Sequence, residues 1–442
     1  MRLLSRNLTA IAGLATGVLA QSVSNPDANS SSVIYQLSTD GEFAFVLGEY
    51  LSLASGGGSA TGEVLRAASQ IVPSDYESWY SEFNFLGDAM HSKATAINAT
   101  RFPVSARDTY FRAASYYRAA DFFLHQKQSD PRIYALWANA TAAFDKAASL
   151  LEAPPTLLNI TGPGFYIPAY YFSAAPNTAQ EGCEPKKRPT VIVGTGYDGS
   201  QQALYHSIGR AILERGYNYI SYEGPGQPSP RRYQNLGFIP NWWDVVTPVV
   251  DYLHTRNDVD TSRIALVGES FGGTLAPRAA SREHRISAVV AIDGMTSMAA
   301  SIIAQLPPQL TALYDGGNVA AFDEVLLGMM YNTSLPTSAR WGIAQGLWSF
   351  KTESPYSWLK QLSAITSEKD ILDKVACPVL VFGAEDDILP VQQSLDVAAA
   401  LGDRATYYLF KNDVGAGQHC QLGAEAQLAQ VTFDWLADIW GL

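Results

Sequence analysis

The chain has 442 residues, 47% of them hydrophobic, and a formal net charge of −12. This length exceeds one ordinary domain and supplies enough apolar residues for a sizeable core, so we expect two structural units. Because the charge is acidic and the basic residues are scattered, the composition argues against a nucleic-acid-binding protein. Three cysteines allow at most one disulfide, which excludes a small disulfide-stapled scaffold.

The first twenty residues are predicted to be a secretory signal peptide. Arg2 and Arg6 precede an apolar run from Leu8 to Leu19, and Ala20 supplies a small residue at its end. The run is too short to cross a bilayer, and no other segment competes as a membrane span. We therefore expect a secreted protein without a transmembrane helix.

Export would expose acceptor sites for modification. Five sequons of the form Asn-x-Ser/Thr follow the expected cleavage site and predict N-glycosylation. They begin at Asn29, Asn98, Asn139, Asn159 and Asn332. Pairing among Cys183, Cys377 and Cys420 is left open, because an odd number of thiols does not define a partner.

Residues 21–150 are predicted to form an N-terminal helical domain. From about residue 40 the sequence is rich in alanine and aromatic residues, with helical spacing at 76–91 and 107–125. The aromatic residues at 110–117 are interpreted as core rather than as a ligand site. Pro154 and Pro155 then mark the boundary with the second unit.

Residues 151–442 alternate strand-like and helix-like segments, which predicts the α/β class with a mostly parallel sheet covered on both faces. The expected strands are residues 165–172, 190–194, 217–222, 263–267, 288–292, 378–382 and 405–410. Residues 301–366 interrupt this rhythm and look helical, so we expect a lid inserted into the core. Its aromatic residues could offer an apolar roof or serve as packing. They are Trp341, Trp348, Phe350, Tyr356 and Trp358.

The sequence Gly268-Glu269-Ser270-Phe271-Gly272 lies between an expected strand and an expected helix. A serine between two glycines at such a turn is typical of a nucleophile elbow, since a side chain at either glycine would collide with its neighbours. The Phe271 N–H at the helix start could then stabilise an oxyanion. The alternative is a structural turn whose serine caps the helix.

A serine nucleophile needs a histidine base, which in this fold follows the serine in the chain. Only two of the six histidines do so. His284 lies in a charged segment that looks like a solvated helix end, whereas His419 lies in a glycine-rich loop before the last expected helix. We therefore predict His419 as the base.

The acid that orients the histidine should follow the strand at 378–382, where three carboxylates are adjacent. Asp386 is predicted as this acid, and Glu385 and Asp387 are interpreted as solvated neighbours. Asp293, just after the strand at 288–292, is the main competitor.

The glycine-rich segment 194–200 follows another expected strand and is predicted to be the oxyanion loop. Its glycines allow close approach of the backbone, so that the Tyr197 N–H could pair with that of Phe271. An ordinary loop with Ser200 as a helix cap is the alternative. No Cys/His metal spacing, phosphate-binding lysine loop or dinucleotide fingerprint is present in the sequence, so we predict neither a metal nor a cofactor.

Taken together, these motifs resemble the alpha/beta hydrolases related to 2,6-dihydroxypseudooxynicotine hydrolase, to the fungal polyketide-shortening hydrolases of pigment biosynthesis and to FrsA-like esterases. The resemblance spans nearly the whole chain after residue 20. It rests on the segments 117–120 (YRAA), 222–228 (YEGPGQP), 268–273 (GESFGG) and 415–420 (GAGQHC).

The resemblance implies hydrolysis of a carbon–carbon bond next to a ketone in an apolar or aromatic small molecule, with a triad at Ser270, Asp386 and His419. The nicotine-catabolic relatives use an extra glutamate in the oxyanion loop, and Asp198 matches it as a shorter candidate auxiliary acid. The signal peptide departs from the family, and no role is carried over to the segment 226–229.

Several alternatives remain open at the level of sequence. A secreted carboxylesterase, lactonase or acyltransferase would use the same triad, because ester and ketone cleavage begin with the same attack. A serine peptidase or a non-catalytic ligand binder is a weaker alternative. Whether the chain forms a homodimer is also left open.

Overall fold

The computed structural model describes residues 34–174 and 186–442. The predicted signal peptide, the sequon at Asn29 and Cys183 therefore lie outside the described residues. Export through the secretory pathway stays a prediction.

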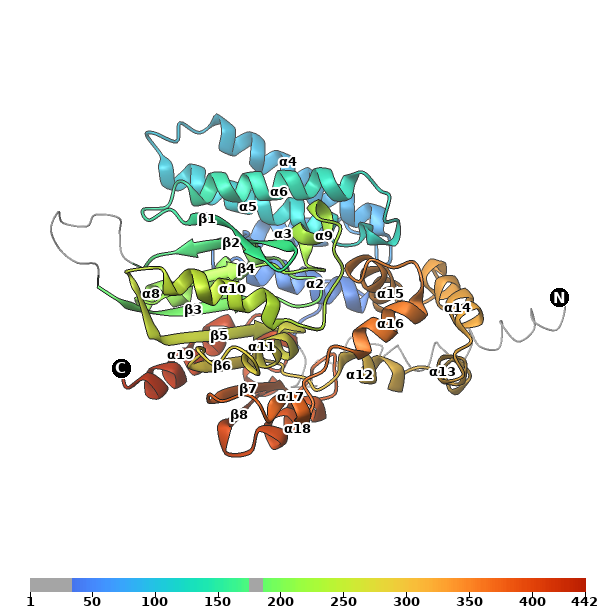
Figure 1. Cartoon of the computed structure of the whole chain (residues 1–442). Helices are drawn as coiled ribbons and strands as arrows, with labels where there is room; N and C mark the ends of the chain where they lie inside the picture. The colour runs from blue at the N-terminus through green and yellow to red at the C-terminus, as the bar shows by residue number, and fades with distance from the viewer. Residues whose placement is uncertain (1–33, 175–185) are drawn as a thin grey trace.

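The N-terminal unit of the described chain is helical. It contains α2 (Gly41–Ser52), α3 (Thr61–Ala68), α4 (Tyr76–Ala96), α5 (Pro103–Asp121), the short η1 (Leu124–Gln126) and α6 (Arg132–Ala148). Local sequence explains where these helices begin: the Asp40 and Asp75 side chains cap α2 and α4, and Pro103 occupies the first turn of α5. In Figure 1, α4, α5 and α6 lie together along one side of the sheet.

The core contains an eight-stranded sheet in the order β1-β2-β4-β3-β5-β6-β7-β8. Its strands are β1 (Thr156–Gly162), β2 (Phe165–Phe172), β3 (Arg188–Gly194), β4 (Asn218–Tyr222), β5 (Val259–Glu269), β6 (Ala288–Ile292), β7 (Val379–Ala384) and β8 (Ala405–Phe410). β2 pairs antiparallel with β1 and β4, and the other neighbours are parallel. The predicted mostly parallel sheet is confirmed.

Strand β1 was not predicted from the sequence. It forms the edge of the sheet, pairs only with β2, and its side chains alternate between exposed and half-buried rather than buried. An edge strand of this kind lacks the apolar run that identifies the inner strands.

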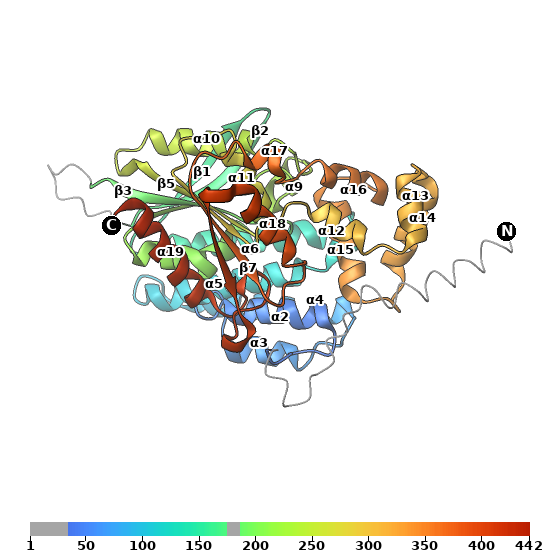
Figure 2. The same cartoon turned by 90° about the horizontal axis from the view of Figure 1, so that it is seen from below.

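Helices cover both faces of the sheet, so the two sets of alternating side chains enter separate cores. Val191 and Val193 on β3 face the cluster shared with the helical domain, while Ile192 faces the opposite cluster. Figure 2 shows α10 and the helices α2–α4 on opposite sides of the sheet.

The core helices are α7 (Gln201–Leu204), η2 (Tyr205–Gly209, a π-helical turn), α8 (Arg210–Glu214), α9 (Pro228–Tyr233), α10 (Trp243–His254), α11 (Gly272–Ala280), α17 (Lys369–Leu372), α18 (Gln392–Leu401) and α19 (Glu425–Trp440). The short turns are η3 (Gly402–Arg404), η4 (Asn412–Val414) and η5 (His419–Gln421).

The interval between β6 and β7 is helical, as the sequence indicates. It contains α12 (Met298–Ala304), α13 (Pro308–Asp315), α14 (Val319–Tyr331), α15 (Thr337–Ser349) and α16 (Pro355–Ser363). Trp341 on α15 stacks on Phe122 of the helical domain with ring centroids 5.2 Å apart, and Gln126 donates a 2.6 Å hydrogen bond to the Met330 carbonyl. The insertion therefore packs against the helical domain beside the sheet.

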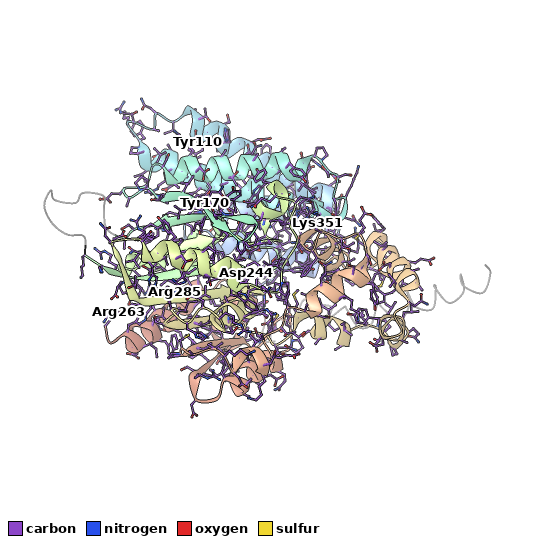
Figure 3. All side chains as sticks on the ribbon, in the orientation of Figure 1. Tyr110, Tyr170, Asp244, Arg263, Arg285 and Lys351 are labelled. Atoms are coloured by element: carbon purple, nitrogen blue, oxygen red, sulfur yellow. The ribbon has the colours of Figure 1, made fainter. Side chains whose placement is uncertain are left out.

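The helical domain is fixed to the core by polar contacts as well as by packing. Tyr170 on β2, labelled in Figure 3, donates a 2.6 Å hydrogen bond to Asp145 on α6. Asp121 at the end of α5 is fully buried and accepts hydrogen bonds from Arg232 on α9 at 2.5 Å and from Arg118 at 3.1 Å. Burial alone would raise the pKa of Asp121, but Arg232, His125 and Arg118 together lower it.

The described sequons are accessible to different degrees. Asn98, Asn139 and Asn159 are exposed, and Asn332 is half-buried at the end of α14. Glycosylation at these positions stays a prediction. Within residues 34–174 and 186–442, no helix combines the length and apolar character needed to cross a bilayer, and Cys377 and Cys420 are free thiols.

We predict that Asp121→Ala destabilises the protein by about 3–5 kcal/mol, because two buried guanidinium groups lose their counter-charge. Urea unfolding followed by circular dichroism measures this change. Asp396→Ala, at an exposed position of α18, is the matched control and should change stability by less than about 0.5 kcal/mol. Equal stability of the two variants would contradict the structural role of Asp121.

Candidate active site

Ser270 lies at a sharp turn between β5 and α11. Its φ of 59° falls in the left-handed region, which is strained for a residue with a side chain. A Cβ at Gly268 would lie 1.9 Å from the Gly272 carbonyl oxygen, and one at Gly272 would lie 2.8 Å from the Gly194 carbonyl oxygen. The turn therefore requires both glycines and holds the Ser270 hydroxyl at the carboxyl edge of the sheet.

Ser270, His419 and Asp387 form a continuous hydrogen-bonded chain. His419 Nε2 is 2.9 Å from Ser270 Oγ, and His419 Nδ1 is 2.7 Å from Asp387 Oδ1. The side chains of His419 and Asp387 are 6% and 8% exposed, so water competes little for these bonds. With a proton on Nδ1, His419 presents an unprotonated Nε2 that can accept the serine proton.

Asp386, the predicted acid, hydrogen-bonds to Gln418, and the carboxylate that hydrogen-bonds to His419 is its neighbour Asp387. Asp386 is exposed and accepts a 2.8 Å hydrogen bond from the Gln418 side chain, while its own backbone N–H donates to the Gly417 carbonyl oxygen. Strand β7 ends at Ala384, and two residues later Asp386 still forms a parallel backbone β-bridge with Gln418, so the chain remains extended here. Because neighbouring side chains of extended backbone point to opposite sides, Asp387 turns inward toward His419.

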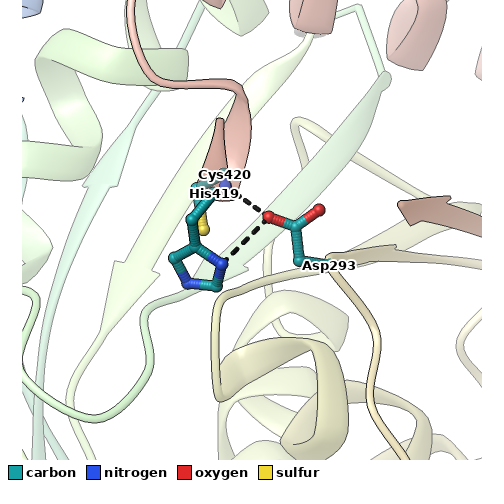
Figure 4. Close-up of side chains that lie close together, drawn as sticks. All are labelled: Asp293, His419 and Cys420. Carbon is teal, nitrogen blue, oxygen red and sulfur yellow. Dashed lines mark hydrogen bonds and ion pairs between the residues drawn. The ribbon is translucent and has the colours of Figure 1, made fainter. Parts of the chain in front are cut away.

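Asp293, the competitor, is also at the site. Its Oδ2 is 3.3 Å from His419 Nδ1, and it accepts hydrogen bonds from the Cys420 backbone N–H and, at 3.1 Å, from the Gln421 side chain. Figure 4 shows the contacts of Asp293 with His419 and with Cys420. Burial, and then the Asp387 carboxylate, raise the pKa of Asp293 to about 7. His419 thus faces two carboxyl groups, of which Asp387 makes the shorter bond.

The groups around His419 shift its pKa. Burial alone would lower the pKa of His419, but the Asp387 carboxylate reverses this and the pKa lies well above the ordinary value. Burial raises the pKa of the Cys420 thiol, so this group stays protonated and is a poor nucleophile.

Asp293, His419 and Cys420 also place three ligand atoms within 4.8 Å of one another, which is close enough for a metal ion. Both nitrogens of His419, however, already bind partners in the chain from Ser270 to Asp387. The same nitrogen cannot bind a metal and serve this hydrogen-bonded chain, so the geometry favours acid–base chemistry.

The predicted oxyanion loop lies directly against the elbow. A Cβ at Gly196 would be 2.6 Å from the Phe271 backbone nitrogen, so only glycine permits this approach. The buried Gln227 side chain donates to the Thr195 carbonyl at 2.7 Å and to the Gly196 carbonyl at 3.3 Å. In a trans peptide the Tyr197 N–H points opposite to the Gly196 carbonyl, hence away from Gln227. Ser200 caps α7, so this alternative role is also observed.

Two further side chains hold this loop, and neither was assigned a role from the sequence. Gln345 on α15 donates to the Tyr197 carbonyl at 2.9 Å, and Arg118 on α5 donates to the Asp198 carbonyl at 2.5 Å. Arg118 and Gln227 lie in segments that carry the family resemblance, which was a usable signal. Gln345 lies in the helical insertion, where no motif marks it.

Asp198, the candidate auxiliary acid, is half-buried beside these groups. Burial raises the pKa of its carboxyl group, against the opposing effects of Arg118 and His419. Its proximity to the site is consistent with an auxiliary role, which stays a prediction.

Comparison with known proteins agrees with the fold. Over 88% of this chain and 95% of the other, the structure is similar to the crystal structure of 2,6-dihydroxy-pseudo-oxynicotine hydrolase, with a TM-score of 0.67 and 19% identity. Residues 191–429, more than half of the chain, match the model described as the alpha/beta hydrolase family. The chain belongs to the alpha/beta hydrolase family.

Its curated relatives include fungal hydrolases of similar length, which confirms the predicted resemblance. The "Hydrolyase poxO" of Penicillium oxalicum is 31% identical over 89% of this chain and 96% of that protein. The "20-hydroxy-prefusarin hydrolase FUS2" of Gibberella moniliformis is 30% identical over 86% and 92%. The "Hydrolase acrC" of Aspergillus aculeatus is 29% identical over 89% and 95%.

We predict that Asp387→Asn lowers the rate at which a fluorophosphonate labels Ser270 by about 100-fold or more, because His419 loses its orienting charge. Asp386→Asn, one residue away and exposed, should label at close to the wild-type rate. Stopped labelling reactions read by intact-protein mass spectrometry give both rates. The reverse order of the two variants would restore Asp386 as the acid.

The pH dependence of the site should follow the titration of His419. The neutral imidazole is the base, and the carboxylates favour the charged form, so labelling should increase with pH with a midpoint above 6.5. In Asp387→Asn the midpoint should move to lower pH. Histidine ring titration by NMR measures this shift, and an unchanged midpoint would contradict the assigned ion pair.

Proposed function

We propose that this protein is a serine-dependent hydrolase that cleaves a carbon–carbon bond next to a ketone in an aromatic or polyketide-like small molecule. The proposal rests chiefly on one observation, the hydrogen-bonded chain from Ser270 through His419 to Asp387. Such a chain activates a serine hydroxyl, which is otherwise unreactive at neutral pH.

In the proposed first step, His419 takes the proton of Ser270 as its oxygen attacks the ketone carbonyl. The Tyr197 and Phe271 N–H groups stabilise the tetrahedral oxyanion. The Gly196 carbonyl held by Gln227 directs the Tyr197 N–H, and the Ser270 carbonyl held by the Gly273 N–H directs that of Phe271, so both donors are oriented before substrate arrives. Collapse of the intermediate breaks the carbon–carbon bond, leaves an acyl group on Ser270 and expels the other fragment as an enolate, which takes up a proton. Once the proton taken from Ser270 has left His419, this residue deprotonates the water that releases the acid.

The substrate class is supported from two directions. The motifs at 117–120, 222–228 and 415–420 resemble carbon–carbon hydrolases, and the relative from Gibberella moniliformis is named for a fungal small molecule, 20-hydroxy-prefusarin. Two aromatic side chains from outside the core add apolar surface near the site. The Phe45 ring on α2 lies 6.4 Å from the His419 ring, and Trp341 on α15 is partly buried and packs against both hydrophobic clusters. We propose that the insertion containing α15 acts as a lid over this surface.

Ser270→Ala should lower turnover of an aromatic β-diketone by at least about 1,000-fold, because the nucleophile is removed. Product analysis by mass spectrometry, with benzoylacetone and an ester or lactone of similar size in parallel, measures this loss. Ser69→Ala, at an exposed position after α3, is the matched control and should retain activity.

The other possible results of this product analysis would each lead to a different conclusion. Serine-dependent cleavage of the ester alone would move the protein to the carboxylesterases. Full turnover by Ser270→Ala would remove the serine mechanism altogether. Well-folded wild-type protein that is neither labelled by a fluorophosphonate nor active would be a ligand binder.

A further inference from the structure

Helix α2 presents one face to the proposed catalytic centre. Glu42, Phe45 and Glu49 are spaced three and four residues apart and share that face, and all three are half-buried. Phe43, Val46 and Leu47 of the same helix are fully buried in the core that the helical domain shares with the sheet. The Phe45 ring lies 6.4 Å from the His419 ring, which places this face beside the triad.

Glu49 is a carboxyl group without a protein partner in this place. Its side chain makes no hydrogen bond within the described residues. The ionisable groups that face it are Asp198 and Arg118 from the loop and α5, Glu269 from the elbow, and the base His419. Burial, and then Asp198, raise the pKa of Glu49 to about 8, against the effects of Arg118 and His419. At neutral pH it therefore carries a proton that it can donate.

Glu49 also lines a small cavity, with about 20 Å³ of free volume, between the helical domain and the start of α7. Trp137 and His206 line the same cavity and are 1% and 4% exposed, yet Trp137 Nε1 and His206 Nε2 have no hydrogen-bond partner within the described residues. His206 Nδ1 contacts the Gly56 carbonyl at 2.9 Å, so Nε2 is left as an acceptor. Buried polar groups of this kind need a polar partner, and the volume holds one small group, either a water molecule or a carbonyl or hydroxyl group of a substrate.

We propose that Glu49 is a catalytic acid that hydrogen-bonds to the second carbonyl oxygen of a β-diketone-like substrate and protonates it as the carbon–carbon bond breaks. This inference rests on the proposed function and names the group that accepts the leaving charge. Burial and Asp198 raise the pKa of Glu42 to about 8 as well, but His419 faces Glu49, and Glu49 rather than Glu42 lines the cavity. Asp198 does not line this cavity either.

The step balances in atoms and charge. When the tetrahedral intermediate collapses, the electron pair of the broken carbon–carbon bond moves into the leaving ketone as an enolate, and the Glu49 proton converts it to a neutral enol. The acyl group remains on Ser270, and Glu49 becomes a carboxylate. The proton that His419 took from Ser270 then passes to the Glu49 carboxylate, which leaves His419 neutral. His419 deprotonates the water that attacks the acyl group and returns this proton to the Ser270 oxygen, so that the carboxylic acid is released, and the enol becomes a ketone. A neutral carboxylic acid beside a developing enolate is an effective stabiliser because its proton is shared with the charge as it forms.

The test compares two substrates in the full-length protein across pH 6 to about 9.5, a window set by the Glu49 pKa of about 8. Benzoylacetone needs its enolate protonated, whereas para-nitrophenyl acetate releases a stable phenolate. Wild-type turnover of benzoylacetone should fall as pH rises through about 8, because Glu49 loses its proton. In Glu49→Gln the ratio of benzoylacetone to ester turnover should fall by about 100-fold, and the alkaline decrease should disappear.

Two further variants keep the test specific. Glu49→Asp retains a carboxylic acid, so it should cleave benzoylacetone at a lower rate and keep the alkaline decrease. This variant tests the proposal also in the case that Glu49→Gln folds poorly. Glu42→Gln removes the same acid group from the same helix and should also retain the decrease. An alkaline decrease and a substrate ratio unchanged in Glu49→Gln would overturn the role of Glu49 alone. Wild-type protein that cleaves the ester but not benzoylacetone would overturn the proposed function and this role with it.

Discussion

The buried carboxylate of Asp121 connects the three parts of the molecule that meet at the proposed active site. Arg232 binds it from the core, and Arg118, on the same helix as Asp121, extends to the Asp198 carbonyl of the oxyanion loop. In a low-dielectric interior such charges are tolerated only when each is paired and hydrogen-bonded. The helical domain, the core and the loop therefore share one set of charges, and displacement of any of them leaves a buried ion without its partner.

The oxyanion loop shows how this arrangement supports chemistry. Its carbonyl groups are held by side chains from three places: Gln227 after β4, Arg118 on α5 and Gln345 on α15. Each fixed carbonyl fixes the peptide plane and with it the direction of the next N–H. Electrostatic stabilisation of a transition state is efficient when donors do not have to reorganise. Gln227, through the Gly196 carbonyl, thus sets the direction of the proposed donor at Tyr197, while Arg118 and Gln345 hold the residues that follow it in the loop.

Features that depend on a few consecutive residues could be predicted from the sequence. Features that depend on how distant segments pair in the folded chain could not. Ser270 and His419 were identified because a strained glycine turn and a glycine-rich loop leave patterns in a few consecutive residues. Asp386 was selected by its position after the expected strand, but the structure places Asp387 against His419. The chain stays extended two residues beyond the predicted end of β7, and only the bridge to Gln418 shows which side chain turns inward. Strand β1 and Glu49 were missed, since an exposed edge strand and an acidic position on a mostly apolar helix have no distinctive spacing.

Phe45 and His419 lie side by side, although one belongs to the first described helix and the other to the loop before the last. The site is therefore incomplete until nearly the whole polypeptide has been synthesised. The apolar residues of α2 through α6 pack in one cluster with strands of the sheet that are synthesised later. Contacts between such distant segments slow folding, because a long loop must close before they form. Proteolytic loss of either end would remove one wall of the same site, so a single measure of hydrolysis reports the integrity of both.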